Sequence, residues 1–369
     1  YGTNSSYNYL INGSKPVIVK APGLVAPDFT WETVTQMDFG FDASFLNNRL
    51  TGTFDWYRRN TKDMLVAGAT LPATLGASVP KSNSADMKTI GWELSLGWND
   101  RLENGFSYWV KGVLSDYQAT ITKYAGNDAG FYSQSDGDGK YYVGQKIGEI
   151  WGYHSNGLFQ SDDEAATIDQ SELYAGKWGA GDVKYEDLDN DGKITKGEET
   201  IYNPGDKSII GNKTPRYQFG ITVGFDYKNF DFEMFWQGTG KRDYMLSGAQ
   251  FWGFTSQWDV PYTPALDYWT ETNTDAYFPR PGWQNGGNRV TSDRYLQSAA
   301  YGRLKNLTVG YTIPKNLTTK WGISRLRLYV TGENLLTITP LNDAFDPETL
   351  GGMTYPINRK VAIGLNLTL

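Results

Sequence analysis

The residues best suited to chemistry in this chain form the acidic stretch DLDNDGKITKGEE at 187–199. Over residues 187–198 it follows the EF-hand calcium-loop pattern D-x-[DN]-x-[DN]-G-x5-E. In that geometry the ligands are carboxylates, a hydroxyl and one backbone carbonyl, and they would come from Asp187, Asp189, Asp191, Lys193 (carbonyl), Thr195 and Glu198. The stretch therefore predicts a bound calcium ion, and the alternative is a solvated acidic turn without an ion.

The segments that flank this loop argue against a calcium sensor, which needs a helix on each side that can swing apart. Glycines interrupt the upstream segment GKWGAGDVKYE, and Pro204 follows shortly after the loop. Within the loop, Gly192 allows the sharp turn and Ile194 can pack inward. We therefore expect a structural role for calcium, because closing a long loop around an ion removes conformational freedom from the segment.

The rest of the chain offers few groups for catalysis. It has no cysteine and a single histidine, His154, which excludes thiolate metal sites and sites with two imidazoles. His154 could serve in acid–base chemistry, but we expect ordinary hydrogen bonds. Acidic pairs such as Asp162 and Asp163 leave a carbohydrate hydrolase open, although no nucleophile elbow or phosphate loop accompanies them. The net charge of -7 argues against a nucleic-acid partner.

The elements that must position these groups are strands, because apolar residues recur at every second position. RYQFGITVGFDY, residues 216–227, places its apolar side chains on one face and its polar or small ones on the other. The apolar face holds Tyr217, Phe219, Ile221, Val223, Phe225 and Tyr227. No run approaches the ~20 apolar residues of a membrane-spanning helix, whereas a β-barrel crosses a bilayer with alternating strands of this kind.

Alternation of this kind predicts about nine strands. We place them at roughly 34–46, 49–60, 86–99, 106–119, 215–227, 230–240, 301–313, 323–335 and 358–369. Short and long connections alternate between them, and rings fall near strand ends, both of which are typical of an outer-membrane barrel. A soluble β-sandwich is the alternative. The polar faces favour Gly, Ser, Thr, Asn and Asp over Lys and Glu, so we predict an all-β fold, a transmembrane antiparallel β-barrel.

The strand count adds a point of topology. The first and the ninth strand each follow a long loop, so both run from the loop rim to the turn rim. Nine antiparallel strands of this kind cannot close into an even-numbered barrel. We therefore expect part of a barrel that begins in an outer loop, with earlier strands missing on its N-terminal side.

Several segments, taken in order, resemble the SusC-like TonB-dependent transporters, which import glycans and peptides across the outer membrane of Gram-negative bacteria. These segments are FTWETVTQMDFGFD (29–42), LNNRLTGTFDWYRRNTKDML (46–65), KTIGWELSLGW (88–98), GEIWGYHSNGLFQSDDE (148–164), GDVKYEDLDNDGKIT (181–195), IIGNKTPRYQFGI (209–221), WQGTGKRDY (236–244), YFPRP (277–281), YGRLKNLTVGYTIP (301–314) and LRLYVTGENLLT (326–337). The resemblance covers essentially the whole chain.

The resemblance implies that residues 1–369 are the C-terminal part of a 22-stranded barrel. The plug domain and the TonB box would be absent from this chain, and residues 120–214 would form a long extracellular loop. It further implies a SusD-like lipoprotein as a hinged lid, TonB acting through the missing plug, outer-membrane lipid around the wall, and a glycan or oligopeptide substrate. A secreted β-rich carbohydrate-active enzyme and a surface adhesin or binding module are the alternatives.

Aromatic residues in the long loops are candidates for a substrate or partner surface, because rings stack on sugars and anchor protein interfaces. The candidates are Trp151, Trp252, Trp258, Tyr262, Trp269 and Trp283. Alternatively, these rings pack the small cores of the loops themselves. On the predicted lumen faces, Arg216, Arg325 and Arg327 have Asp226, Asp231 and Glu233 as possible partners.

Overall fold

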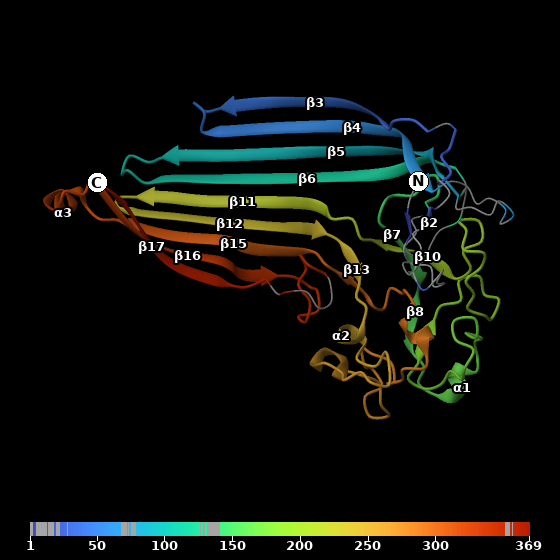
Figure 1. Ribbon diagram of the computed structural model, residues 1–369. Coiled ribbons are helices and arrows are strands. Elements are labelled where there is room, and N and C mark those ends of the chain that lie inside the picture. The colour runs from blue at the N-terminus through green and yellow to red at the C-terminus, as the bar shows by residue number, and fades with distance from the viewer. Residues whose placement is uncertain are drawn as a thin grey trace.

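Nine long antiparallel strands form one continuous sheet in the computed structural model (Figure 1). The structure describes residues 3–4, 13, 18–19, 23–27, 29–67, 72, 74, 79–125, 127, 130, 141–350, 355 and 357–369. In sheet order from one edge to the other, the strands are β17 (Lys360–Thr368), β16 (Arg325–Ile338), β15 (Tyr301–Thr312), β12 (Phe230–Lys241), β11 (Arg216–Tyr227), β6 (Ser107–Tyr124), β5 (Lys81–Arg101), β4 (Leu50–Ala67) and β3 (Thr33–Phe45). This is the all-β antiparallel fold that the alternation predicts.

The sheet has one apolar and one polar face because the register keeps every strand's apolar positions side by side. One apolar row runs across five strands through Phe41, Phe54, Leu94, Leu114 and Phe219. The matching row on the opposite face holds Gly40, Asp55, Glu93, Ser115 and Gln218. Many apolar-face side chains are exposed, and Ile363 is 83% exposed. An apolar face of this extent on the outside of a sheet suits contact with lipid.

Glycines on the polar face make room for large side chains from neighbouring strands. A Cβ atom on Gly91 in β5 would lie 2.5 Å from the ring of Tyr57, which comes from β4. Gly224 lies in the same way against the indole of Trp109, and Gly364 against the ring of Tyr329. The small residues of this face therefore fix the positions of rings that lie flat along the wall.

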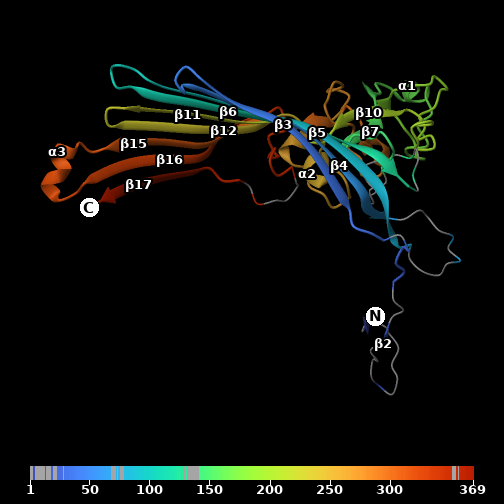
Figure 2. The ribbon, with the colours of Figure 1, turned by 90° about the horizontal axis from the view of Figure 1, so that it is seen from above.

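Short turns and long connections lie at opposite ends of the sheet (Figures 1 and 2). The turn end includes residues 46–49, 102–106 and 228–229, and the β15–β16 connection carries α3 (Lys315–Thr318) and η4 (Thr319–Trp321). The loop end receives the described parts of the connections 125–215, 242–300 and 339–359. β6 continues to Tyr124, about five residues beyond its predicted end, so the longest connection begins later than expected. β5 likewise begins at Lys81 instead of near residue 86.

Short elements organise the long connections. Between β6 and β11 lie β7 (Glu149–Tyr153), β8 (Ser155–Leu158), α1 (Asp162–Ala165), β9 (Val183–Tyr185) and β10 (Lys207–Asn212). Between β12 and β15 lie β13 (Asp243–Met245), α2 (Ala249–Trp252), η2 (Thr263–Leu266), η3 (Gly286–Arg289) and β14 (Leu296–Ser298). Near the N-terminus, β1 (Thr3–Asn4) pairs with β2 (Ile18–Val19). β7 pairs with β10, β8 with β9, and β13 with β14.

The two longest connections share one hydrophobic core, here called the loop core. Its fully buried residues include Val183, Tyr185, Leu246, Phe251 and Tyr295, which come from both connections. Buried hydrogen bonds join them as well: Asn288 accepts from the backbone of Val183 at 2.8 Å, and the Tyr185 hydroxyl donates to the carbonyl of Gly287 at 2.6 Å. The loops are therefore a packed unit at one end of the sheet.

No helix in the described part of the chain is long and apolar enough to cross a membrane.

Candidate cation site and loop surface

The acidic loop lies between β9 and β10, and its own backbone folds it tightly. The Asp187 carboxylate accepts hydrogen bonds from the backbone nitrogens of Asn190 at 2.7 Å and Gly192 at 2.8 Å. Asn190 and Gly192 both have positive φ angles, of 62° and 84°, which a glycine adopts easily and an asparagine tolerates. Ile194 is 1% exposed and joins the loop core, as the sequence suggests.

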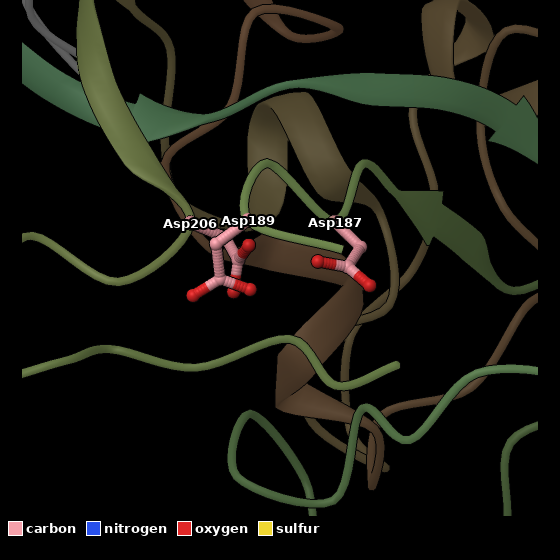
Figure 3. A group of neighbouring side chains, drawn as sticks. All are labelled: Asp187, Asp189 and Asp206. Atoms are coloured by element: carbon pink, nitrogen blue, oxygen red, sulfur yellow. The ribbon is translucent and has the colours of Figure 1, made fainter. Parts of the chain in front are cut away.

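Three carboxylates come together at this loop: Asp187, Asp189 and Asp206 (Figure 3). One oxygen from each lies within 4.8 Å of the others. Asp206 is fully buried, directly precedes β10, and accepts from the backbone nitrogens of Leu188 and Thr195, both at 2.7 Å. It therefore ties the two halves of the acidic loop together while presenting its charge to Asp187 and Asp189.

The EF-hand pattern does not include Asp206. Among the described residues, the group that could hold an ion includes neither Asp191 nor Glu198. An EF-hand returns the carboxylate of position 12 on a helix, whereas here residues 196–204 form turns and Glu198 is exposed. No local signal marks Asp206, because it reaches the loop through tertiary folding. The carbonyl of Lys193 and the hydroxyl of Thr195 remain predicted ligands.

The electrostatics of the group suit a hard divalent cation. Burial, followed by repulsion from Asp191, raises the pKa of the Asp189 carboxyl. Burial also acts to raise the pKa of Asp187, but hydrogen bonds from the backbone nitrogens of Gly192, Asn190 and Asp191 lower it overall. Three converging carboxylates repel one another, and an oxygen-seeking ion such as calcium would relieve that repulsion. The donor set therefore fits calcium.

Five of the six candidate loop rings divide into an exposed and a buried group, and the sixth, Trp151, is half-buried. Trp258, Tyr262 and Trp283 are exposed, at 84%, 48% and 47%. Trp252 and Trp269 are each only 8% exposed and belong to the loop core, which favours the alternative that they pack the loops themselves. Trp252 packs edge-on against Tyr295, with ring centroids 4.5 Å apart. Burying such rings gives irregular loops the apolar area that holds them together.

Four exposed apolar side chains follow one another within residues 258–266 of the β13–β14 connection, and we call them the tryptophan patch: Trp258, Val260, Tyr262 and Leu266. Asp259 fixes the backbone beside Trp258, since its carboxylate accepts from the backbone nitrogens of Thr255 at 2.9 Å and Ser256 at 2.8 Å. A hydrogen bond from the Thr255 hydroxyl leads the interactions that lower the pKa of Asp259. The patch is therefore held in an ordered turn that keeps large apolar side chains in solvent, which is typical of an interaction surface.

Comparisons with known proteins identify the family. A family model described as "TonB dependent receptor-like, beta-barrel" matches residues 1–335. The chain belongs to this family of TonB-dependent receptors. A relative called TonB-dependent receptor P3, from Formosa agariphila, is 30% identical over 94% of this chain and 35% of its own length. TonB-dependent receptor SusC from Bacteroides thetaiotaomicron is 25% identical over 100% of this chain and 35% of its own length.

Solved structures show the same fold. The structure titled RagAB peptide importer in the "open-open" state matches with a TM-score of 0.74 and 22% identity, covering 100% of this chain and 37% of that chain. A second structure, titled RagAB peptide transporter, matches with a TM-score of 0.73. The chain spans about a third of the length of its curated relatives, and its sheet is the C-terminal portion of a TonB-dependent receptor barrel.

Membership of the TonB-dependent receptor family implies the outer membrane of a Gram-negative bacterium and sets the hydrolase alternative aside, because these receptors are transporters and not enzymes. His154 fits this view. Its ring nitrogens lie 2.7 Å from Asp293 and 2.7 Å from the Ser208 hydroxyl, a geometry also found in catalytic triads. The structure has a cavity of about 470 Å³ in the loop unit and one of about 540 Å³ lined in part by β12. His154 lines neither of them, so its ring does not face a substrate-sized space there. His154 makes the hydrogen bonds expected of it and joins the two long connections.

Two of the three candidate arginines on the receptor wall form ion pairs. Arg327 in β16 pairs with Asp231 in β12, one of the partners that the sequence suggests. Gly310 in the intervening β15 leaves space for the pair, since a Cβ there would lie 2.5 Å from both groups. Arg216 pairs with Asp116 and not with a predicted partner. Arg216 and Arg327 are therefore neutralised within the wall, whereas among the described residues Arg325, Asp226 and Glu233 form no ion pair.

Proposed function

We propose that the protein containing this chain imports a glycan or oligopeptide nutrient by TonB-dependent active transport, with a SusD-like surface lipoprotein as its lid. The two-faced sheet supports this proposal most strongly. Its apolar face suits lipid, its polar face suits the wall of a lumen, and packed loops lie at one end only. Such a wall must be rigid. The ion pairs between its strands and the rings that pack against wall glycines support this requirement.

The lid partner would contact the loop end. The tryptophan patch there is an exposed apolar surface on a fixed turn, with the features of an interface anchor. Trp283, 47% exposed, is a further candidate for contact with partner or substrate. The similar RagAB structures are described as a peptide transporter and a peptide importer, which is a property of those proteins and motivates an oligopeptide as one substrate class here.

Calcium would act as a clasp on the loop unit. The group of Asp187, Asp189 and Asp206 sits between β9 and β10, so an ion there would connect two strands of the longest connection. The predicted effect is to stiffen a surface that must keep its shape for a partner.

Growth and uptake assays test the transport proposal. Cells that carry the full-length gene should accumulate labelled oligosaccharide or oligopeptide only when TonB is present, and deletion of an adjacent gene for a SusD-like lipoprotein should reduce uptake. Surface binding of the nutrient without TonB-dependent accumulation would instead support the adhesin alternative and refute transport.

A further inference from the structure

A cavity of about 470 Å³ opens in the loop unit beside the acidic loop. Its volume lies within the range of ~300–1,000 Å³ usual for small-molecule sites. It lies between β7, β10 and the segment after η3, and its wall includes Trp151, Lys196, Glu199, Lys207 and Arg289. Trp151 is the one ring among the six sequence candidates that lines it.

The charges in the cavity wall favour an anionic ligand. Three of the lining side chains are cationic and one is acidic. Glu199 is already neutralised by Lys207, whose ammonium nitrogen lies 2.6 Å from its carboxylate. Among the described residues, neither Lys196 nor Arg289 forms an ion pair. Glu172, outside the lining, uses a carboxylate oxygen to accept from the Lys196 backbone at 3.1 Å. Lys196 and Arg289 therefore give the lining side chains a net positive charge, and the carboxylates of Glu172 and Asp206, which act on Tyr153, lie outside the lining.

Arg289 is held in place by the backbone around it. Its guanidinium donates to the carbonyl oxygens of Phe254, Gly282 and Trp283 at 3.4, 3.3 and 3.1 Å. Burial lowers the pKa of Arg289, and the negative charge of Asp259 partly offsets this effect. A half-buried guanidinium in a fixed position can bind an oxyanion with little loss of side-chain entropy.

The backbone around the cavity is unsuited to an extended peptide. Peptides of that kind bind by adding a strand to an open sheet edge. Here the edge of β7 that borders the cavity is occupied, because the Tyr153 nitrogen donates to the Thr291 carbonyl at 2.9 Å and the Asp293 nitrogen donates to the Tyr153 carbonyl at 3.1 Å. A ring wall with charged donors and one carboxylate acceptor instead suits a sugar, whose faces are apolar and whose rim carries hydroxyls.

The acidic loop and the cavity share their framework. Lys196 directly follows Thr195, Lys207 directly follows Asp206, and the Thr195 nitrogen donates to the Asp206 carboxylate at 2.7 Å. One half-buried hydrogen bond thus sets the spacing of two cationic residues in the cavity wall.

We propose that this cavity binds an acidic sugar unit, a pyranose bearing a carboxylate or a sulfate group, with Arg289 and Lys196 contacting the anion and Trp151 packing against the ring. This inference rests on the proposed transport function and names the substrate class as an anionic glycan. The carboxylate and the sulfate share the chemistry of a planar or tetrahedral oxyanion, and binding experiments separate them.

Calorimetric titration of the purified full-length receptor in detergent tests the proposal. The probes are tetrasaccharides containing galacturonate or glucuronate, the same compounds after carboxyl reduction, a sulfated oligosaccharide on a neutral backbone, and a tetraglutamate peptide. We expect at least one acidic sugar to bind about tenfold more tightly than its uncharged counterpart, since charge-assisted hydrogen bonds are lost on neutralisation. The uronate and sulfated arms show which anion is preferred.

Variants locate the binding in this cavity. Arg289→Gln and Lys196→Gln should each weaken the acidic sugar about threefold to tenfold without affecting the neutral sugar. Trp151→Ala should weaken both. Lys177→Gln is the matched control, because Lys177 is an 81% exposed lysine of the same connection outside the cavity. Lys196→Gln protects the test against misfolding, since the Lys196 side chain is exposed.

Equal affinity for reduced and unreduced sugars, equal or tighter binding of tetraglutamate, no binding of any acidic sugar, or wild-type affinity in Arg289→Gln and Lys196→Gln would overturn the inference. TonB-dependent uptake measured in the same cells distinguishes failure of the anionic site from failure of the transport proposal. Transport of a neutral glycan or a peptide that is unaffected by these variants refutes the anionic site and leaves the transport proposal intact. Absence of TonB-dependent uptake of any nutrient refutes the transport proposal itself.

Discussion

Asp206 is the residue that changes which carboxylates could bind an ion at the acidic loop. The sequence pattern places the last carboxylate at Glu198, whereas the carboxylate that lies beside Asp187 and Asp189 is that of Asp206, eight positions later. In an EF-hand the Glu198 carboxylate would bind the ion, and in the clasp proposed here the Asp206 carboxylate would. Substituting each residue in turn therefore distinguishes the two arrangements.

We predict that Asp206→Asn lowers calcium affinity by about tenfold or more, because affinity follows the charge count of the ligands. It also removes an acceptor for Leu188 or Thr195. Glu198→Gln should change affinity less than twofold. The measurement is calcium titration of the full-length protein followed by isothermal calorimetry, with Asp163→Asn as a control on an exposed acid. A larger effect of Glu198→Gln would restore the EF-hand geometry, and no calcium binding at millimolar concentration would refute the clasp.

Gly310 shows how a missing side chain supports an ion pair on the receptor wall. We predict that Gly310→Val separates Arg327 from Asp231 and destabilises the folded barrel by about 2–3 kcal/mol, an effect typical of overpacking. The matched control is Gly112→Val, because a Cβ on Gly112 has no neighbour within 4 Å. Heat-dependent migration in gels, which separates folded from unfolded barrels, measures both. Similar melting of the two variants would mean that the pair adds nothing to stability.

The long connections behave as one element because buried polar groups join them. Gln170, 1% exposed, donates to the carbonyl of Val183 and accepts from the nitrogen of Tyr185, so a side chain takes the place of a strand partner for β9. Asn288 does the same from the other connection. Such side-chain substitutes for strand pairing satisfy backbone groups that irregular loops would otherwise leave buried and unpaired.

At this scale we predict that Tyr185→Phe loosens the loop unit without affecting the barrel. The change removes the shorter of the two hydrogen bonds that the buried Gly287 carbonyl accepts and leaves only the longer one, from the Val290 nitrogen at 3.5 Å, a loss of about 0.5–1.5 kcal/mol. Hydrogen exchange should accelerate in residues 183–186 and 285–290, while the barrel's heat-dependent gel migration stays the same. Tyr202→Phe, at an 83% exposed site, is the control. Unchanged exchange in Tyr185→Phe would show that the loop core depends on its rings alone.

Strand positions were predictable from this sequence, whereas loop contacts were not. Alternation depends on neighbours two positions apart, so strands such as β11 and β12 match their expected ranges within a residue. Trp252 and Trp258 lie six positions apart in one segment and look equally suited to a surface, yet one is buried and the other exposed. Only the packing of residues 242–300 against residues 125–215 separates them, and no local pattern records that packing.

In the whole molecule, exposed tryptophans lie at both ends of the sheet. Trp258 lies on the loop connections, and Trp321, 64% exposed, lies in η4 on the β15–β16 connection at the turn end. A lid that covers the long loops would reach the first and not the second. Trp321 therefore provides a control of the same residue type and similar exposure.

We predict that Trp258→Ala, alone or with Tyr262→Ala, weakens co-purification of the SusD-like lipoprotein and lowers uptake, because each buried interface ring contributes about 1–3 kcal/mol to association. Trp321→Ala should leave both values at the wild-type level. Co-purification in detergent and TonB-dependent uptake in cells are measured on the same strains. If Trp258→Ala keeps full partner binding, the tryptophan patch lies outside the lid interface, whereas loss of uptake with binding intact would place the patch on the substrate path.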